Sequence, residues 1–235
     1  MRQLMFAVFA ASALAGCGSV SSPLPAKPAD MAPLASPGGA SGDEAALYLD
    51  VVNGLVEQKR YAAAIAFLDG YAAKKVKLEA RYWLLRGNAL AGLNREEDAR
   101  AAYAQLDSTP LAAEGWNGKG RVAAARQEWR IAASNFQEAV RNQPSNPDFL
   151  NNLAFADMQF GENDQSAFYL RQALELRPGS SLIRNNLLIA LTLAGDQAGA
   201  EAILRTVKDA PEREKLRGVI EDAIRDNDLT KDGKS

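Results

Sequence analysis

The sequence predicts an all-α protein built from about five helix–turn–helix repeats, and three observations support this prediction. First, a pattern of small and large residues recurs every 34 positions. Its members are Ala132, Phe136 and Ala139, then Ser166, Leu170 and Ala173, then Ala200, Leu204 and Val207. Second, Pro144 and Pro178 recur at the same period, where a proline ends a helix. Third, hydrophobic residues make up 47% of the chain but aromatic residues only 7%, which favours packed helices over a β-sandwich. A period of this length is typical of stacked helical hairpins.

Glycine and alanine mark the positions where two helices of a hairpin approach each other. Gly120 follows Trp116 by four residues, and the small Gly120 is expected to leave room that Phe136 fills. Gly161 and Gly195 are also one repeat apart, at the point where the first helix of a pair must turn into the second. We expect left-handed backbone at these two glycines.

The spacing sets the expected boundaries. Repeats are predicted at 45–79, 80–112, 113–146, 147–180 and 181–214, within a helical domain at 43–226. The first two repeats match the pattern less well, as terminal repeats often do. A capping helix is predicted at 212–225, followed by a flexible tail at 227–235. We expect one face of this helix to hold Leu216, Val219, Ile220, Ala223 and Ile224. The alternative is a partner-binding helix.

The order Trp116, Gly120, Ala132, Phe136, Pro144 resembles the tetratricopeptide repeat (TPR) family. The resemblance implies a right-handed α-solenoid in which the first helix of each repeat lines a concave groove that binds peptides. The implied groove residues are Asn53, Asn88, Asn117, Arg121, Asn151, Phe155, Met158, Leu182, Asn185 and Ile189. The asparagines could hold a peptide backbone, because an amide both donates and accepts hydrogen bonds. The alternative is binding by a convex or edge surface.

The N-terminal sequence predicts a secretion signal and a lipid attachment to the membrane. Arg2 precedes a short apolar run, which is typical of a secretory signal peptide, here expected at 1–16. The run ends in Leu14-Ala15-Gly16-Cys17, which resembles the lipobox of bacterial lipoproteins. This resemblance implies a covalent lipid on Cys17 and, because Gly18 rather than aspartate follows, sorting to the outer membrane facing the periplasm. The alternative is an ordinary signal peptide with an incidental cysteine.

Residues 17–42 combine the cysteine with a segment rich in proline, serine and glycine. The segment lacks helical periodicity, and such a composition favours a disordered tether. We expect it to let the repeat domain stand away from the membrane.

Composition excludes several classes of function. The chain has no histidine and one cysteine, so the commonest general base and metal ligand are missing. Its formal net charge of −2 does not provide the basic face that nucleic acid requires. The sequence also lacks a glycine-rich phosphate loop and metal-ligand spacing. We therefore expect no enzyme activity, no metal, no cofactor other than the lipid, no nucleic acid and no small-molecule substrate.

The last two repeats read Asn151-Asn152-Leu153-Ala154-Phe155 and Asn185-Asn186-Leu187-Leu188-Ile189. With the lipobox and the tether, they resemble the TPR lipoproteins of the Tad (Flp) tight-adherence pilus, the TadD type. This resemblance implies a pilotin-like assembly factor whose partner is a pilus secretin subunit or another envelope-assembly component. Two alternatives remain: a general periplasmic scaffold for cell-envelope enzymes or outer-membrane assembly, and a type IV pilus pilotin.

Overall fold

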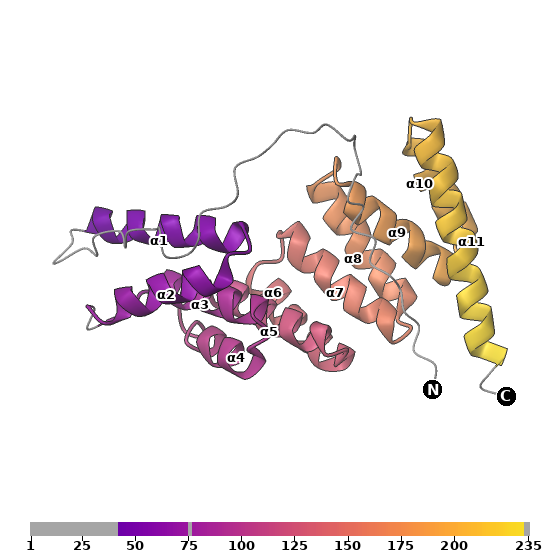
Figure 1. The fold of residues 1–235 in the computed structure, drawn as a ribbon. Helices are drawn as coiled ribbons and strands as arrows, with labels where there is room; N and C mark the ends of the chain where they lie inside the picture. The colour runs from indigo at the N-terminus through magenta and orange to yellow at the C-terminus, as the bar shows by residue number, and fades with distance from the viewer. Residues whose placement is uncertain (1–41, 75–76, 233–235) are drawn as a thin grey trace, which may run out of the picture. The chain divides into compact units, whose positions relative to one another are not determined.

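The computed structural model describes residues 42–74 and 77–232, with side chains described for 44–74 and 77–225. The expected signal peptide, Cys17 and nearly all of the tether lie outside the described residues. The described part contains eleven helices and no strand (Figure 1). They are α1 (Gly42–Glu57), α2 (Tyr61–Ala72), α3 (Ala80–Gly92), α4 (Glu96–Ala104), α5 (Ala112–Ala125), α6 (Trp129–Asn142), α7 (Pro147–Gln159), α8 (Asn163–Leu176), α9 (Ser181–Leu193), α10 (Gln197–Thr206) and α11 (Ala210–Asp232).

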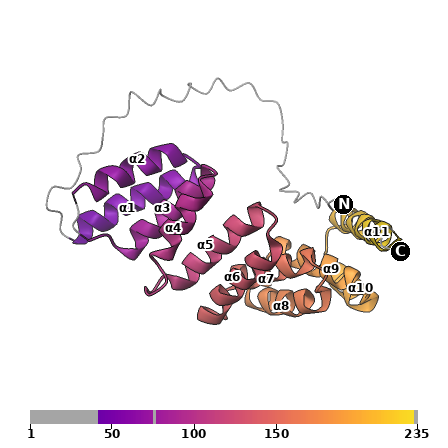
Figure 2. The same cartoon turned by 90° about the horizontal axis from the view of Figure 1, so that it is seen from below.

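The first ten helices form five consecutive hairpins, one within each expected repeat (Figure 2). The second helix of each of the first four hairpins also packs against the first helix of the next. The predicted all-α array of hairpins is confirmed. Pro144 and Pro178 each lie two residues beyond the end of a helix, α6 and α8, as their lack of a backbone donor predicts.

Every hairpin turns through one residue with a positive φ. Gly161 and Gly195 have φ values of 93° and 79°, which confirms the predicted left-handed backbone. Lys59, Asn94 and Gln127 occupy the same place in the first three hairpins, with φ values of 58° to 60°. At each turn, the left-handed residue donates to the carbonyl three residues back and the next residue donates five back, as in Gln127 to Ala124 and Glu128 to Ala123. This Schellman arrangement pairs carbonyls that the helix end leaves open.

Glycine lets the two helices of a hairpin approach an aromatic ring. A Cβ atom on Gly120 would lie 2.5 Å from a ring carbon of Phe136, and one on Gly87 would lie 2.5 Å from the ring of Tyr103. Gly118 also faces the Tyr103 ring. Both rings are buried. The predicted packing of Phe136 against Gly120 is therefore present, and Tyr103 repeats it between α3, α4 and α5.

The last helix differs from the expected cap. α11 runs from Ala210 to Asp232, past the expected end at 225, because no proline follows Pro211 in its first turn. Its main contact is α9, and Leu216 and Ala223 are buried. Val219 and Ile224, expected on the same buried face, are 38% and 41% exposed. The apolar face of α11 is thus wider than the contact that covers it. None of the described helices is both long and apolar enough to cross a membrane.

Candidate protein-binding surface

All ten expected groove residues lie on the first helices of the hairpins. Asn53 is on α1, Asn88 on α3 and Ile189 on α9. The others are Asn117 and Arg121 on α5, Asn151, Phe155 and Met158 on α7, and Leu182 and Asn185 on α9. Apart from the exposed Arg121, they are asparagines, most of which make polar contacts within the array, and apolar residues that are partly open.

The asparagines of the last three repeats form rungs between neighbouring repeats. Asn152 Nδ2 donates to Asn117 Oδ1 at 2.8 Å, and Asn186 Nδ2 donates to Asn151 Oδ1 at 2.8 Å. Asn151 is only 8% exposed. These contacts align α5, α7 and α9, and the side-chain oxygens of Asn117 and Asn151 are already occupied.

The ladder ends at Asn185. Its Oδ1 atom is buried and has no hydrogen-bond partner. The two asparagines of each rung are 35 positions apart, and the residue 35 positions after Asn185 is Ile220 on α11. The side chain of Ile220 has no amide that could donate a hydrogen bond to Asn185. A buried acceptor without a donor costs free energy, roughly 1–3 kcal/mol. The last rung is thus a weak point at the junction with α11.

Two asparagines near the N-terminal end also make local contacts. Asn53 Nδ2 donates to Glu57 Oε1 at 2.7 Å within α1. Asn88 Oδ1 accepts from the Tyr103 hydroxyl at 2.8 Å. Burial raises the pKa of Tyr103 to about 12, while the charge of the exposed Arg121 acts in the opposite direction. Among the expected polar groove residues, Arg121 alone is exposed, whereas the asparagines are buried or partly buried.

The apolar members lie on α7 and α9. Leu182 is 58% exposed, while Phe155, Met158 and Ile189 are partly buried. The Phe155 ring meets the Trp129 ring edge-on with centroids 5.9 Å apart, and Met158 packs against the core around α9. These four residues are called the apolar strip below. The strip offers hydrophobic contact area without a charged group, which suits the apolar face of a partner segment.

Asp157 is a feature that the sequence reading missed. It lies on α7 and is 7% exposed, although the residues one repeat earlier and later are Ala123 and Leu191. Burial, together with the negative charge of the nearby Glu162, raises its pKa to about 6. The signal was present in the sequence, because a carboxylate replaces an apolar residue at a position that is otherwise part of the core.

Among the described residues, no group of three or more histidine, cysteine or acidic side chains could hold a metal ion. The acidic groups instead pair with arginines of neighbouring elements. Arg100 and Arg126 both contact Glu128 across the second and third repeats, and Arg177 contacts Asp148 at 2.6 Å. The charged surface therefore consists of ion pairs that join the hairpins.

Two segments of the chain match the profiles of a known family of repeats. Residues 117–156 and residues 147–180 each match a profile described as "Tetratricopeptide repeat". Residues 117–180 therefore carry the sequence pattern of tetratricopeptide repeats. The chain is also similar to the TPR repeat-containing protein PA4299 of Pseudomonas aeruginosa, with 29% identity over 168 residues. The match covers 71% of this chain and 66% of that relative, just under two thirds of its length.

Solved TPR-like structures share the arrangement of hairpins. The structure of MamA from Desulfovibrio magneticus RS-1 covers 77% of this chain and 98% of its own, with a TM-score of 0.58 and 18% identity. MamA AMB-1 covers 73% of this chain and 94% of its own, with a TM-score of 0.55 and 16% identity. At this identity the likeness concerns the fold alone. The matched repeat segments are of a type that suggests a scaffold for protein–protein interaction.

Proposed function

We propose that this protein is an outer-membrane lipoprotein that supports assembly of a Tad/Flp pilus secretin, in the manner of a pilotin. A covalent lipid on Cys17 would hold the protein at the periplasmic face of the outer membrane. The TPR array would bind a segment of the secretin subunit and bring it to that membrane. The proposal makes the protein a carrier and an assembly factor rather than a catalyst.

One observation carries the binding part of the proposal. The apolar strip on α7 and α9 stays partly open, and α7 lies within a segment that matches the tetratricopeptide repeat profile. An exposed leucine such as Leu182 is unremarkable alone, but a row of apolar side chains along adjacent helices is a typical protein-binding surface. The amide oxygens of Asn117 and Asn151 are used in the rungs. The affinity for a client segment is therefore assigned to the strip, with Arg121 as the exposed polar contact.

The anchoring part rests on the sequence. The chain's one cysteine follows Leu14-Ala15-Gly16 directly, where a lipobox requires it. Several acyl chains on one terminus bind a membrane firmly, whereas a single chain binds only marginally. The proline-rich residues that follow would act as a spacer. Gly18 supports sorting to the outer membrane, and the pilus assignment rests on the resemblance of this layout to the TadD type.

The anchoring proposal is tested by Cys17→Ala. We expect the variant to leave the membrane fraction while the circular dichroism spectrum of its TPR domain stays unchanged, because the cysteine lies far from the repeats in the chain. A Cys17→Ala protein that fractionates with membranes as the parent does would refute lipid anchoring. The secretin-binding proposal would survive that result.

The binding proposal is tested with a matched pair of leucines. Leu182 on α9 belongs to the apolar strip and is 58% exposed, whereas Leu176 near the end of α8 is 47% exposed and lies outside the strip. We expect Leu182→Gln to weaken binding of the purified secretin subunit about tenfold, since it removes ~1–2 kcal/mol of hydrophobic contact. Leu176→Gln should bind as the parent does. Equal binding by both variants, or equal loss, would contradict a site at the strip.

A general periplasmic scaffold is the second candidate, and the absence of charge from the strip favours it. A strip that binds through hydrophobic contact discriminates weakly between clients, because specificity requires polar or repulsive elements as well. Quantitative capture from an envelope extract distinguishes the candidates. One dominant secretin would support the pilus role, and several cell-wall enzymes in similar amounts would support the scaffold. A type IV pilus secretin in place of the Tad one would support the type IV pilotin.

A further inference from the structure

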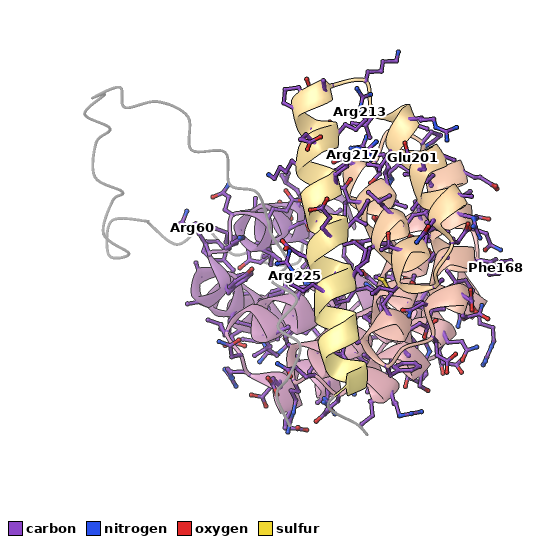
Figure 3. The ribbon with its side chains drawn as sticks, turned by 90° about the vertical axis from the view of Figure 1, so that its right-hand side faces the viewer. Arg60, Phe168, Glu201, Arg213, Arg217 and Arg225 are labelled. Atoms are coloured by element: carbon purple, nitrogen blue, oxygen red, sulfur yellow. The ribbon has the colours of Figure 1, made fainter. Side chains whose placement is uncertain are left out.

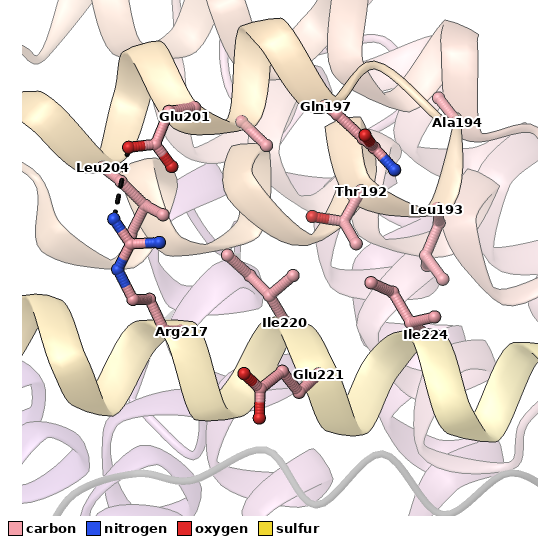
Figure 4. Close-up of a pocket in the computed structure, with 12 residues that line it drawn as sticks. Thr192, Leu193, Ala194, Gln197, Glu201, Leu204, Arg217, Ile220, Glu221 and Ile224 are labelled. Atoms are coloured by element: carbon pink, nitrogen blue, oxygen red, sulfur yellow. Dashed lines mark hydrogen bonds and ion pairs between the residues drawn. The ribbon is translucent and has the colours of Figure 1, made fainter.

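A pocket of about 490 Å³ lies between the last hairpin and α11 (Figure 4). Its apolar wall is formed by Leu193 from the end of α9, Leu204 from α10, and Ile220 and Ile224 from α11. Arg217 of α11 contacts Glu201 of α10 at 3.2 Å on one side of the pocket (Figures 3 and 4). Glu221 is the other charged residue in the lining. Thr192 and Gln197 also line it, so the pocket has both apolar and polar walls.

The pocket follows from an unusual placement of α11. After α2, α4, α6 and α8, the next helix packs directly on the helix before it, and this contact joins each repeat to the next. α11 instead packs mainly on α9. The face of α10 that a sixth repeat would cover is thus partly open. Ile224 remains 41% exposed beside it, so this end of the array has apolar surface that the described residues leave partly open.

The opposite end of the array has a complementary gap. α1 is the first helix of the first described hairpin and packs against α2 and α3. Leu47 and Val51, four residues apart and therefore on one side of the helix, are 65% and 38% exposed. A Cβ atom on Gly54, the next position along this side, would meet no atom within 4 Å. In a longer array, the second helix of a preceding repeat would cover such a face.

Both surfaces carry charged residues. The described charged side chains of α1 are all acidic, namely Glu44, Asp50 and Glu57, and Asp50 pairs with Arg81. At the pocket, Arg217 lies at the rim and Arg225 is exposed one residue beyond Ile224. Glu201 is already paired with Arg217, and Asp222 with Arg225. Within the pocket Glu201 and Glu221 outnumber Arg217, so an acidic helix docked there would contact Arg217 and Arg225 but would also lie near Glu221.

We propose that α1 of one copy docks in the α10–α11 pocket of a second copy, so that the two arrays continue end to end. Leu47 and Val51 would meet Leu204, Ile220 and Ile224 in the place that a further repeat would occupy. The contact joins two different surfaces, so each copy keeps one free end, and the association can extend into a chain or close into a ring. The proposal does not depend on the identity of the client or on the pilus assignment.

The small size of both surfaces indicates a weak association. Interfaces that bury less than about 1,200 Å² in total are mostly transient. We therefore expect a monomer at low concentration and larger species as the concentration rises. An associating state of this kind would be favoured where a lipid anchor concentrates the protein on a membrane.

The test is sedimentation velocity of the full chain over a hundredfold range of concentration, in a detergent with micelles in excess over protein. We expect the weight-average sedimentation coefficient of the parent to rise with concentration. Leu47→Asp removes the α1 surface and Ile224→Asp removes the pocket surface. Each alone should raise the dissociation constant at least tenfold. The matched control is Leu176→Asp, which places the same charge at an exposed leucine of α8 and should associate as the parent does.

A mixing experiment makes the test specific for end-to-end contact. Leu47→Asp protein keeps an intact pocket and Ile224→Asp protein keeps an intact α1, so the two should form dimers together and no larger species. Circular dichroism and melting temperatures of all variants should match the parent, since the substituted side chains are exposed. The proposal is overturned if the parent stays monomeric throughout, if the mixture contains no dimer, or if the control variant dissociates as the other two do.

Discussion

The first three repeats and the last two use different chemistry at equivalent positions of the same hairpin. Lys119 on α5 stands one repeat before Leu153 on α7 and two before Leu187 on α9. Lys119 is 13% exposed, and its ammonium lies 3.8 Å from the centroid of the Trp116 ring and 2.6 Å from Asp107. Leu153 and Leu187 are buried among apolar neighbours. An ion pair under an aromatic ring thus takes the place of a leucine in the earlier repeat.

The second repeat shows that Lys119 is not an isolated case. Arg86, at the same position, contacts Asp69 of α2 at 2.6 Å and the Tyr82 hydroxyl at 3.2 Å. The rings of Tyr48, Tyr71 and Tyr82 stack in this region with centroids 5.4 Å and 6.0 Å apart. The earlier repeats therefore rely on aromatic rings with glycine and polar groups, and the later ones on leucine, alanine and amide rungs.

The comparison has a functional consequence. In the later repeats, aliphatic residues fill the interior and further apolar residues remain on the surface as the strip. In the earlier repeats, buried rings such as Tyr71 and Tyr103 lie among the aliphatic core residues and are accompanied by polar contacts and glycines. We infer that the earlier repeats serve mainly to stabilise the array, while the later repeats supply its apolar binding surface.

The largest effect is expected from filling the space that glycine leaves for a ring. Gly120→Leu should lower the free energy of unfolding by ~3 kcal/mol, because its Cβ alone would lie 2.5 Å from the buried Phe136 ring. Gly54→Leu on α1 is the control, since no atom lies within 4 Å of its Cβ position. Chemical denaturation measures both. Equal midpoints for Gly120→Leu and the parent would mean that the ring does not require the glycine.

A pH-dependent effect is expected at Asp157. Its pKa is raised to about 6 in the folded protein, against 3.8 for the ordinary group, so the folded state holds the proton more tightly than the unfolded chain. The contribution of Asp157 to the free energy of unfolding is therefore most favourable below pH 4, and it is lost as the pH rises through about 6. Asp157→Asn should remove this penalty and stabilise the protein by ~1–3 kcal/mol at pH 8.

The control for Asp157 is the same variant at pH 4, where both side chains are neutral. There the gain should shrink to a few tenths of a kcal/mol, roughly the scale of a conservative surface change. Asp148→Asn, at an exposed ion pair with Arg177, should show neither the gain at pH 8 nor its loss at pH 4. A gain from Asp157→Asn that is independent of pH would contradict the raised pKa.

Replacing Lys119 by the leucine found at the equivalent position of the later repeats tests the comparison directly. Lys119→Ala should destabilise by ~1–2 kcal/mol, because it removes the ring contact and leaves Asp107 without its partner. Lys119→Leu should stay within ~1 kcal/mol of the parent, since a hydrophobic residue of similar volume often substitutes for a buried charge. Melting in low and high salt measures the difference. If Lys119→Leu is as unstable as Lys119→Ala, a leucine cannot replace the ion pair at this position.

The sequence predicts the hairpins well because their signals are local and periodic. Gly161, Gly195, Pro144 and the Gly120–Phe136 pair can all be read from spacing. The placement of α11 on α9 was not predictable, because its apolar residues do not say which helix they cover. The rungs were only partly visible: the asparagines recur with the repeat, but the pairing of Asn151 with Asn186 depends on how two repeats stack. Whether a client binds the apolar strip stays a prediction.

The smallest effect concerns the turns, where spacing predicted two left-handed residues and missed three. Gln127 has a φ of 60° at the turn where the later repeats carry Gly161 and Gly195. A left-handed conformation costs an ordinary residue roughly 1–2 kcal/mol, and glycine recovers this at the expense of a more flexible unfolded chain. Gln127→Gly should therefore raise the free energy of unfolding by ~0.5 kcal/mol, and Gly161→Gln should lower it by ~1 kcal/mol. If thermal melting shows that both substitutions destabilise, then Gln127 makes a contact that offsets its strained backbone, and the earlier and later turns differ in chemistry as their helices do.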